Sequence, residues 1–110
     1  EIKAIEDKEV PLITVDELKK KFTNRKFDLI DVRMPDEHRQ FNIGGKNIPL
    51  DELDACVSEL VLEKPLVFYC RSGVRSAKAV RQILNAYPKV NVVSLEGGIL
   101  AWQAKFGVRD

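Results

Sequence analysis

The sequence predicts an α/β fold, a single domain whose central, mainly parallel sheet is flanked by helices on both faces. Short apolar segments over 27–32, 65–70 and 90–95 have the length and composition of buried strands. Segments with helical spacing of apolar residues lie between and after them. Such alternation requires crossover connections, so the strands are expected to run parallel. A length of 110 residues suits about one domain.

The first helix is predicted at the segment TVDELKKKF. Thr14 is a capping residue with Glu17 three positions later, and Leu18 and Phe22 follow at the i, i+4 spacing. This pattern indicates a short helix that begins after Thr14.

Between the first two predicted strands the sequence indicates loops and short helices. Pro35 is placed to begin a turn or a short helix. Residues 43–50 contain two glycines and a proline, so they are expected to form a loop with a little extended chain. Asp51 is expected to cap a helix over 51–60.

The second half of the chain predicts two more helices. The helix over 75–87 ends at Pro88, and a last helix is predicted over 97–106, with Leu100 and Trp102 packing inward. The apolar stripe of the first of these helices comprises Ala79, Val80, Ile83, Leu84 and Tyr87.

Composition and charge exclude several classes of function. The net charge of +1 gives no general attraction to nucleic acid or anionic lipid. No apolar stretch approaches the ~20 residues that span a bilayer, and the first residues lack a signal-peptide core. We therefore predict a cytoplasmic protein with neither nucleic acid nor membrane as a partner. The polar segment 1–11 is interpreted as a linker or tether, and residues 12–110 as the domain.

Two cysteines and one histidine are too few for a structural zinc site, so we predict no metal and no cofactor. Cys56 lies on the apolar side of a helical pattern and is interpreted as a small buried apolar residue. His38 lies in the charged segment DEHRQ and is interpreted as a solvated helix residue. Cys70 differs from both, because it ends an apolar strand beside arginine and glycine.

The segment VFYCRSGVRSAKAV places Cys70 where parallel sheets form their sites, at the carboxyl end of a strand. A helix follows within a few residues, so backbone N–H groups can turn inward around the sulfur and favour negative charge there. Arg71 and Arg75 add positive charge, and Gly73 allows a tight curl. The same features would stabilise a thiolate.

These residues resemble the rhodanese family of sulfurtransferases along nearly the whole chain. LIDVRMPDEHRQFNIGGKNIPL (29–50) resembles the first signature of the family, VFYCRSGVRSAKAV (67–80) its active-site loop, and LEGGILAW (95–102) its C-terminal signature. One departure is Phe41-Asn42-Ile43, where the family commonly has Gly-His-Ile. The family histidine that Asn42 replaces here is not the nucleophile of the family.

The resemblance implies that Cys70 attacks the outer sulfur of a donor, becomes a persulfide and passes that sulfur to a nucleophilic acceptor. Asp31 and Arg33 would support the site, Asp31 by holding the arginine of the loop and Arg33 by pairing with Glu37. Arg71 and Arg75 would orient an anionic donor. The loop whose N–H groups would stabilise the persulfide comprises Arg71, Ser72, Gly73, Val74, Arg75 and Ser76.

Two other functions remain alternatives. A cysteine-dependent phosphatase or arsenate reductase would use a similar cradle, but protein phosphatases have a longer loop, whereas four residues separate Cys70 from Arg75 here. The shorter loop suits one extra sulfur better than a phosphate. A non-catalytic docking module is the second alternative, although such rhodanese-like domains typically lack the cysteine.

The segments CRSGVRSA and NIGGKNIPL most resemble rhodanese domains that follow an adenylyltransferase domain. That resemblance implies an N-terminal adenylyltransferase domain in the full-length protein, and a ubiquitin-like sulfur carrier of molybdopterin or thiamine biosynthesis as the acceptor. The donor would be thiosulfate or a cysteine desulfurase. A stand-alone thiosulfate sulfurtransferase is the alternative.

Overall fold

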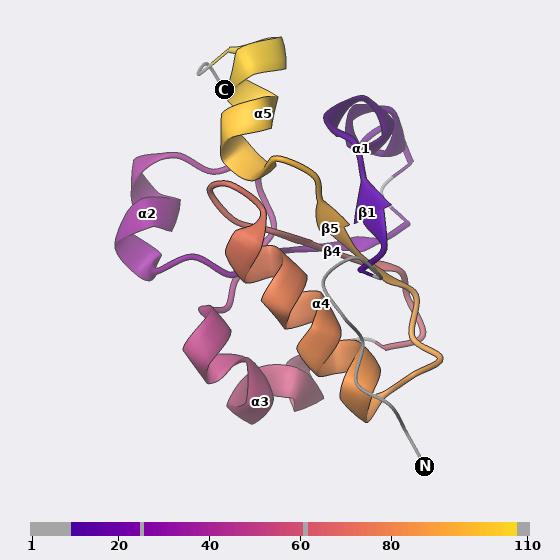
Figure 1. Ribbon diagram of the computed structural model, residues 1–110. Helices are drawn as coiled ribbons and strands as arrows, with labels where there is room; N and C mark the ends of the chain where they lie inside the picture. The colour runs from indigo at the N-terminus through magenta and orange to yellow at the C-terminus, as the bar shows by residue number, and fades with distance from the viewer. Residues whose placement is uncertain (1–9, 25, 61, 108–110) are drawn as a thin grey trace.

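The computed structural model describes residues 10–24, 26–60 and 62–107. Within these ranges the strands form one sheet in the order β1-β5-β4-β2-β3, and every neighbouring pair is parallel, which confirms the predicted α/β fold (Figure 1). The strands are β1 (Leu12–Ile13), β2 (Asp28–Asp31), β3 (Lys46–Asn47), β4 (Leu66–Tyr69) and β5 (Val92–Leu95).

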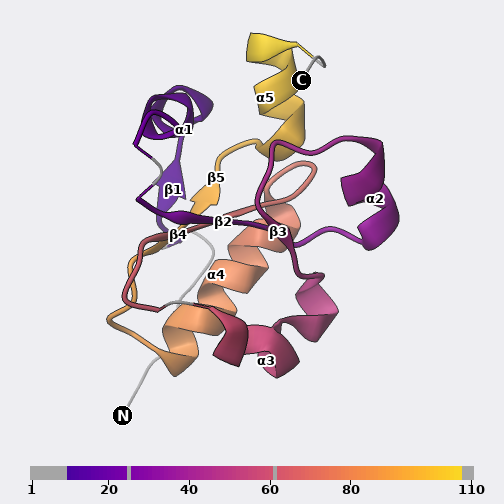
Figure 2. The ribbon, with the colours of Figure 1, turned by 180° about the vertical axis from the view of Figure 1, so that it is seen from behind.

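Helices cover both faces of the sheet because successive strand residues point to opposite sides. Figures 1 and 2 show α3 and α4 on one side, and α1 and α5 on the other. Phe68 of β4 packs with the α3 and α4 side, while its neighbour Tyr69 packs with α1 and α5. The helices are α1 (Val15–Lys21), α2 (Pro35–Gln40), α3 (Leu53–Cys56), α4 (Val74–Ala86) and α5 (Gly98–Phe106).

The start of α1 confirms the predicted cap at Thr14. Its hydroxyl accepts a hydrogen bond from the Glu17 backbone N–H at 3.1 Å, and the Glu17 carboxylate accepts one from the Thr14 N–H at 2.9 Å. This reciprocal pair satisfies two backbone donors that would otherwise lack partners. Leu18 is fully buried beneath the cap.

The prediction of one continuous helix over 51–60 is wrong, because this segment forms three short helical pieces. Two 3₁₀ turns, η2 (Leu50–Glu52) and η3 (Val57–Glu59), flank the short α3, and Asp51 lies inside the first turn instead of capping it. The Leu50 N–H donates to the carbonyl of Val32 at 3.0 Å, just past the end of β2. This contact makes the turn begin one residue before the expected cap.

Two predicted core positions are also wrong, for local geometric reasons. Leu100 is 43% exposed, whereas Trp102 is 6% exposed. Residues two apart on a helix lie about 200° around its axis, so both cannot face inward. Tyr87 is 40% exposed because it follows the last turn of α4, where its backbone has left the helical conformation.

The edges of the sheet are β1, which the sequence did not predict, and β3, which lies within residues 43–50 where a little extended chain was expected; each has two residues. Most of the predicted tether 1–11 lies outside the described residues, and its described part begins at Val10, which is buried. The Pro11 carbonyl accepts a hydrogen bond from the Ser94 N–H. Among the described residues, no helix combines the length and apolar character needed to cross a membrane.

Candidate active site

Cys70 lies directly after β4, an inner strand of the sheet, and is fully buried. Its sulfur accepts hydrogen bonds from the backbone N–H groups of Gly73 at 3.1 Å and Ser76 at 3.3 Å. The thiol in turn donates to the Ser76 hydroxyl at 3.6 Å. Of the six loop residues predicted from the sequence, Gly73 and Ser76 thus supply N–H groups to the sulfur, and these donors favour negative charge there.

The first turn of α5 holds this loop in shape. The N–H groups of Ile99 and Leu100 donate to the carbonyls of Cys70 and Arg71 at 2.9 and 3.0 Å. These bonds aim the two carbonyls toward α5, which leaves the following N–H groups free to face the sulfur. Gly98 makes the approach possible, because a Cβ there would lie 2.4 Å from the Cys70 carbonyl oxygen.

A pair of buried serines lies beneath the sulfur. The Ser76 hydroxyl is 2.7 Å from the hydroxyl of Ser94 and donates to the Gly73 carbonyl at 3.2 Å. Ser94 is on β5 and fully buried, and the sequence analysis missed it. The available signal was a single hydroxyl in the otherwise apolar run VVSL, which in a buried strand requires a hydrogen-bond partner.

The ion pairs around the loop differ from those predicted. Arg75 pairs with Glu37, through Nη1–Oε1 at 2.8 Å and Nη2–Oε2 at 3.0 Å, while Arg33 pairs with Asp31. The predicted pairs of Asp31 with the loop arginine and of Arg33 with Glu37 are therefore wrong. Asp31 is buried at the end of β2, and the side chain of Arg33, two residues later, turns back to contact its carboxylate. Glu37 lies on α2 and contacts Arg75 of the loop after Cys70.

The Arg75–Glu37 pair is bidentate and only partly exposed, at 33% and 31% of the two side chains. The hydrogen bonds from Arg75 lower the pKa of Glu37 to about 2, against the opposing effect of partial burial, and the Met34 N–H adds to the lowering. The hydrogen bond to Glu37 likewise raises the pKa of Arg75. Both groups are charged throughout the physiological range.

Asp31 organises a second, deeper network. Its carboxylate accepts from Arg33 Nε at 2.9 Å and Nη2 at 2.8 Å, and lies 2.8 Å from His38 Nδ1. Burial acts to lower the pKa of Arg33, but the hydrogen bonds and charge of Asp31 outweigh it and raise that pKa. His38 is 22% exposed and bonded to Asp31, so its interpretation as a solvated residue is wrong. This network joins α2 to the end of β2.

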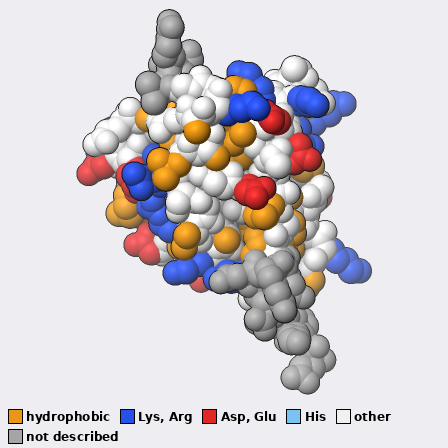
Figure 3. All heavy atoms as spheres, turned by 45° about the horizontal axis from the view of Figure 1, so that its top comes forward, with side chains coloured by type: hydrophobic (Ala, Val, Ile, Leu, Met, Phe, Trp, Pro, Cys, Tyr) orange, Lys and Arg blue, Asp and Glu red, His pale blue; other side chains and the backbone are white. Residues whose placement is uncertain are grey.

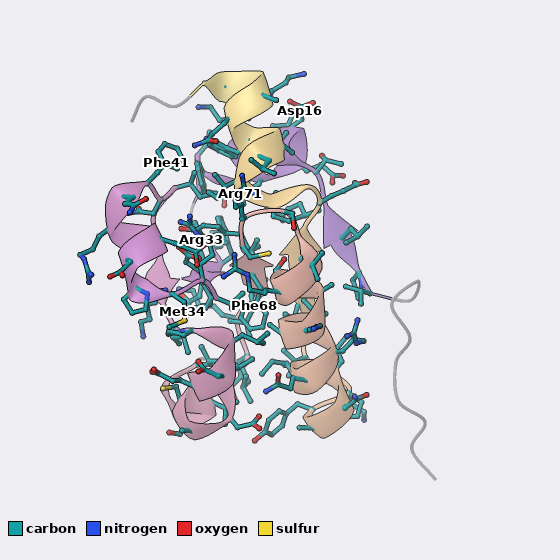
Figure 4. The ribbon with its side chains drawn as sticks, turned by 60° about the vertical axis from the view of Figure 1, so that its left-hand side comes forward. Asp16, Arg33, Met34, Phe41, Phe68 and Arg71 are labelled. Atoms are coloured by element: carbon teal, nitrogen blue, oxygen red, sulfur yellow. The ribbon has the colours of Figure 1, made fainter. Side chains whose placement is uncertain are left out.

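The mouth of the loop combines a cation with apolar side chains. Arg71 is exposed, and Figure 4 shows it beside the first turn of α5, above Arg33. Met34, Val74 and Leu100 are 51%, 62% and 43% exposed, which is high for large apolar residues. On the face shown in Figure 3, hydrophobic side chains lie exposed among acidic and basic ones.

Two hollows lie near this region. One of about 400 Å³ is lined by Met34, Leu50 and Arg75 among others, so it reaches the loop. Another of about 660 Å³ lies between α1, α5 and the end of α2, lined by aromatic residues such as Trp102 and Phe106 but not by Cys70. Cys70 does not line the smaller hollow either, so its buried sulfur lies outside both. Within the described ranges, no three His, Cys, Asp or Glu side chains gather as metal ligands would.

Comparison with known families decides the classification. The family model described as Rhodanese-like domain matches residues 14–105. The chain belongs to the rhodanese family. Among solved structures, the rhodanese-related protein of Thermoplasma volcanium superposes with a TM-score of 0.78 at 30% identity, covering 87% of this chain and 93% of that one. The rhodanese fold thus accounts for almost all of the described residues.

Curated relatives of this rhodanese domain include proteins of different length. YqhL of Bacillus subtilis is 39% identical over 74% of this chain and 64% of its own length. A sulfurtransferase of Allochromatium vinosum is 36% identical over 67% of this chain and 69% of its own length. The probable adenylyltransferase/sulfurtransferase MoeZ of Mycobacterium tuberculosis is 37% identical over 73% of this chain, which spans 21% of that protein.

Proposed function

We propose that this rhodanese domain is a sulfurtransferase that carries sulfane sulfur as a persulfide on Cys70. The observation that supports the proposal most directly is the enclosure of the Cys70 sulfur by the N–H groups of Gly73 and Ser76. Membership of the rhodanese family and the sulfurtransferase of Allochromatium vinosum support the same class of reaction.

In the proposed reaction the Cys70 thiolate attacks the outer sulfur of a donor. The donor's sulfur–sulfur bond breaks, its electron pair leaves with the donor fragment, and a new sulfur–sulfur bond forms on Cys70. A nucleophilic acceptor then attacks the outer sulfur and regenerates the thiolate. The N–H groups of Gly73 and Ser76 already point at the position where negative charge resides in the thiolate, so they need no reorganisation.

Access to the sulfur depends on the mouth of the loop. Cys70 is fully buried, so a donor reaches its sulfur only when the overlying side chains move aside. Val74 and Arg71 are exposed at this mouth and can change rotamer without disturbing the core. The enclosed sulfur is thereby protected from water between turnovers.

The geometry favours sulfur transfer over phosphatase chemistry. A phosphatase of this type needs the arginine that closes its loop to bind the phosphoryl oxygens, but both Nη atoms of Arg75 contact Glu37. The short loop between Cys70 and Arg75 supports the same choice. Retention of Cys70, with the N–H groups of Gly73 and Ser76 bonded to its sulfur, argues against a purely docking role.

We also propose the sulfur donor, the acceptor and a fused domain for this sulfurtransferase. The match to about a fifth of MoeZ supports a fused adenylyltransferase domain and a ubiquitin-like sulfur carrier as acceptor. The exposed apolar side chains of Met34, Val74 and Leu100 around the mouth fit a protein partner. Thiosulfate or a cysteine desulfurase would supply the sulfur. A stand-alone thiosulfate sulfurtransferase remains the alternative, and the cytoplasmic location stays a prediction.

The test is the intact mass of the protein after incubation with thiosulfate, and separately with a cysteine desulfurase and cysteine. We expect a gain of one sulfur atom that is lost with cyanide and is absent from Cys70→Ser. The matched control is Cys56→Ala, which changes a half-buried cysteine outside the loop and should gain sulfur like the wild type. A gain of sulfur by Cys70→Ser would refute the proposal. So would the absence of any gain by the wild-type protein with both donors.

A further inference from the structure

The charges around Cys70 are largely cancelled within the protein. Arg33 is held by the Asp31 carboxylate, and Arg75 by the Glu37 carboxylate. Among the described residues, the guanidinium of Arg71 is the cation of the loop that no carboxylate holds. The site therefore offers an approaching donor one available guanidinium instead of three.

The contact between Arg75 and Glu37 uses the same atoms that an oxyanion would need. Arginine binds carboxylates and sulfur or phosphorus oxyanions through paired N–H groups. Here Nη1 and Nη2 of Arg75 each contact one oxygen of Glu37, at 2.8 and 3.0 Å. A donor with a sulfonate end must displace this carboxylate or approach without the help of Arg75.

We propose that Glu37 sets the donor preference of the site, making transfer from thiosulfate slower than transfer from organic persulfides. Thiosulfate is a dianion, and its leaving group is the sulfite dianion, so it gains most from free guanidinium groups. An organic persulfide carries less charge at the reacting end and leaves as a single thiolate. The inference rests on the proposed role of Cys70 as a persulfide carrier.

Both reactions leave one extra sulfur atom on Cys70, and the two products differ only by a proton, so the gain in mass can be compared directly between the donors. With thiosulfate, the Cys70 thiolate takes the outer sulfur and sulfite leaves with the electron pair of the broken bond. With a persulfide RSSH, the thiolate takes the terminal sulfur with its proton and RS⁻ leaves. No oxidant or reductant is consumed in either case, so a substitution that changes one rate and not the other reports on recognition of the donor.

The carboxylate of Glu37 is built to stay in place. Its Oε1 also accepts the Met34 N–H at 3.0 Å, so the same group caps α2 and holds Arg75. Because the hydrogen bonds from Arg75 lower the pKa of Glu37 to about 2, the contact is not released by protonation near neutral pH. The contact that disfavours thiosulfate is thus already formed before any donor binds.

The experiment measures how fast Cys70 gains sulfur, by intact mass, from thiosulfate and from the persulfide of N-acetylcysteine methyl ester, whose organic part is uncharged. In Glu37→Gln the amide oxygen can still cap α2, but the charge on Arg75 is no longer neutralised. We expect the rate constant with thiosulfate to rise about tenfold, equivalent to about 1.4 kcal/mol. The rate constant with the persulfide should stay within about twofold, since that donor needs no paired guanidinium.

Two further variants separate specificity from general charge and folding effects. Asp36→Asn removes a neighbouring carboxylate that is 80% exposed and pairs with Arg39, so it should leave the ratio of the two rates unchanged. In an Arg75→Gln background, Glu37→Gln should no longer raise the thiosulfate rate, because the two side chains act as one unit. The Glu37→Asp variant, which keeps the charge, should stay closer to the wild type than Glu37→Gln does.

The outcomes are distinguishable. An equal change in both donor rates in Glu37→Gln, or a fall in the thiosulfate rate, would overturn the assigned role of Glu37 while leaving Cys70 as the carrier. An equal rise in Asp36→Asn would also overturn it, because net charge alone would then explain the effect. If wild-type Cys70 gains sulfur from neither donor, the proposed function itself is refuted.

Discussion

Substitution of Gly98 by alanine should damage the active-site loop through backbone contacts alone. Gly98 begins α5 with φ +58°, a conformation that L residues rarely adopt. A Cβ there would lie 2.4 Å from the Cys70 carbonyl oxygen and 2.6 Å from that of Arg71. No side chain can move aside to relieve these contacts, so the loop or the helix must shift.

The expected size of the effect follows from these distances. Lengthening the closest contact from 2.4 Å to at least 3.0 Å requires a shift of about 0.6 Å. The left-handed backbone costs about 1 kcal/mol, and the two hydrogen bonds from α5 to Cys70 and Arg71 are worth about 1 kcal/mol each. Gly98→Ala should therefore lower the free energy of unfolding by about 2 to 3 kcal/mol and slow sulfur gain by up to about 100-fold.

The assay pairs urea unfolding with the rate of sulfur gain at Cys70. Gly107→Ala is the matched control, since Gly107 also has a positive φ of +84° but a Cβ there meets nothing within 4 Å. It should lose about 1 kcal/mol and react at the wild-type rate. If Gly98→Ala reacts as fast as Gly107→Ala, the reasoning that α5 shapes the loop is wrong.

The ion pairs give two further predictions. In Glu37→Gln, the free energy of unfolding should fall by about 1 to 2 kcal/mol at pH 7, discounted for partial exposure. Because the native pKa of Glu37 is lowered to about 2 from 4.5, this difference from the wild type should hold above about pH 4.5 and disappear as pH falls toward 2 in urea titrations. A difference that grows on acidification would contradict the sign. Asp31→Asn leaves the charge of Arg33 buried without its partner and should cost about 3 to 5 kcal/mol in the same assay; a loss below about 1 kcal/mol would show that solvent compensates.

The position of the site could be predicted because it depends on local sequence patterns. The apolar run that ends at Cys70 predicts a buried strand, and Gly73 with the following helical pattern predicts the turn into α4. The capping residues at Thr14 likewise act within one helical turn. Such features are determined by neighbours along the chain, so the order of residues is enough to reveal them.

The partners of the charged side chains could not be predicted in this way. Arg75 and Glu37 are 38 positions apart, and which carboxylate meets which arginine depends on how α2 lies against the loop. The hydrogen bonds of Ser94 and His38 depend on the same packing. By itself the sequence predicted the three inner strands of the sheet, the loop after β4 and the candidate nucleophile Cys70, because backbone propensity and periodicity act locally. Only the tertiary structure decided which arginines pair with which carboxylates, because pairing over long sequence separations is set by the distance between packed elements.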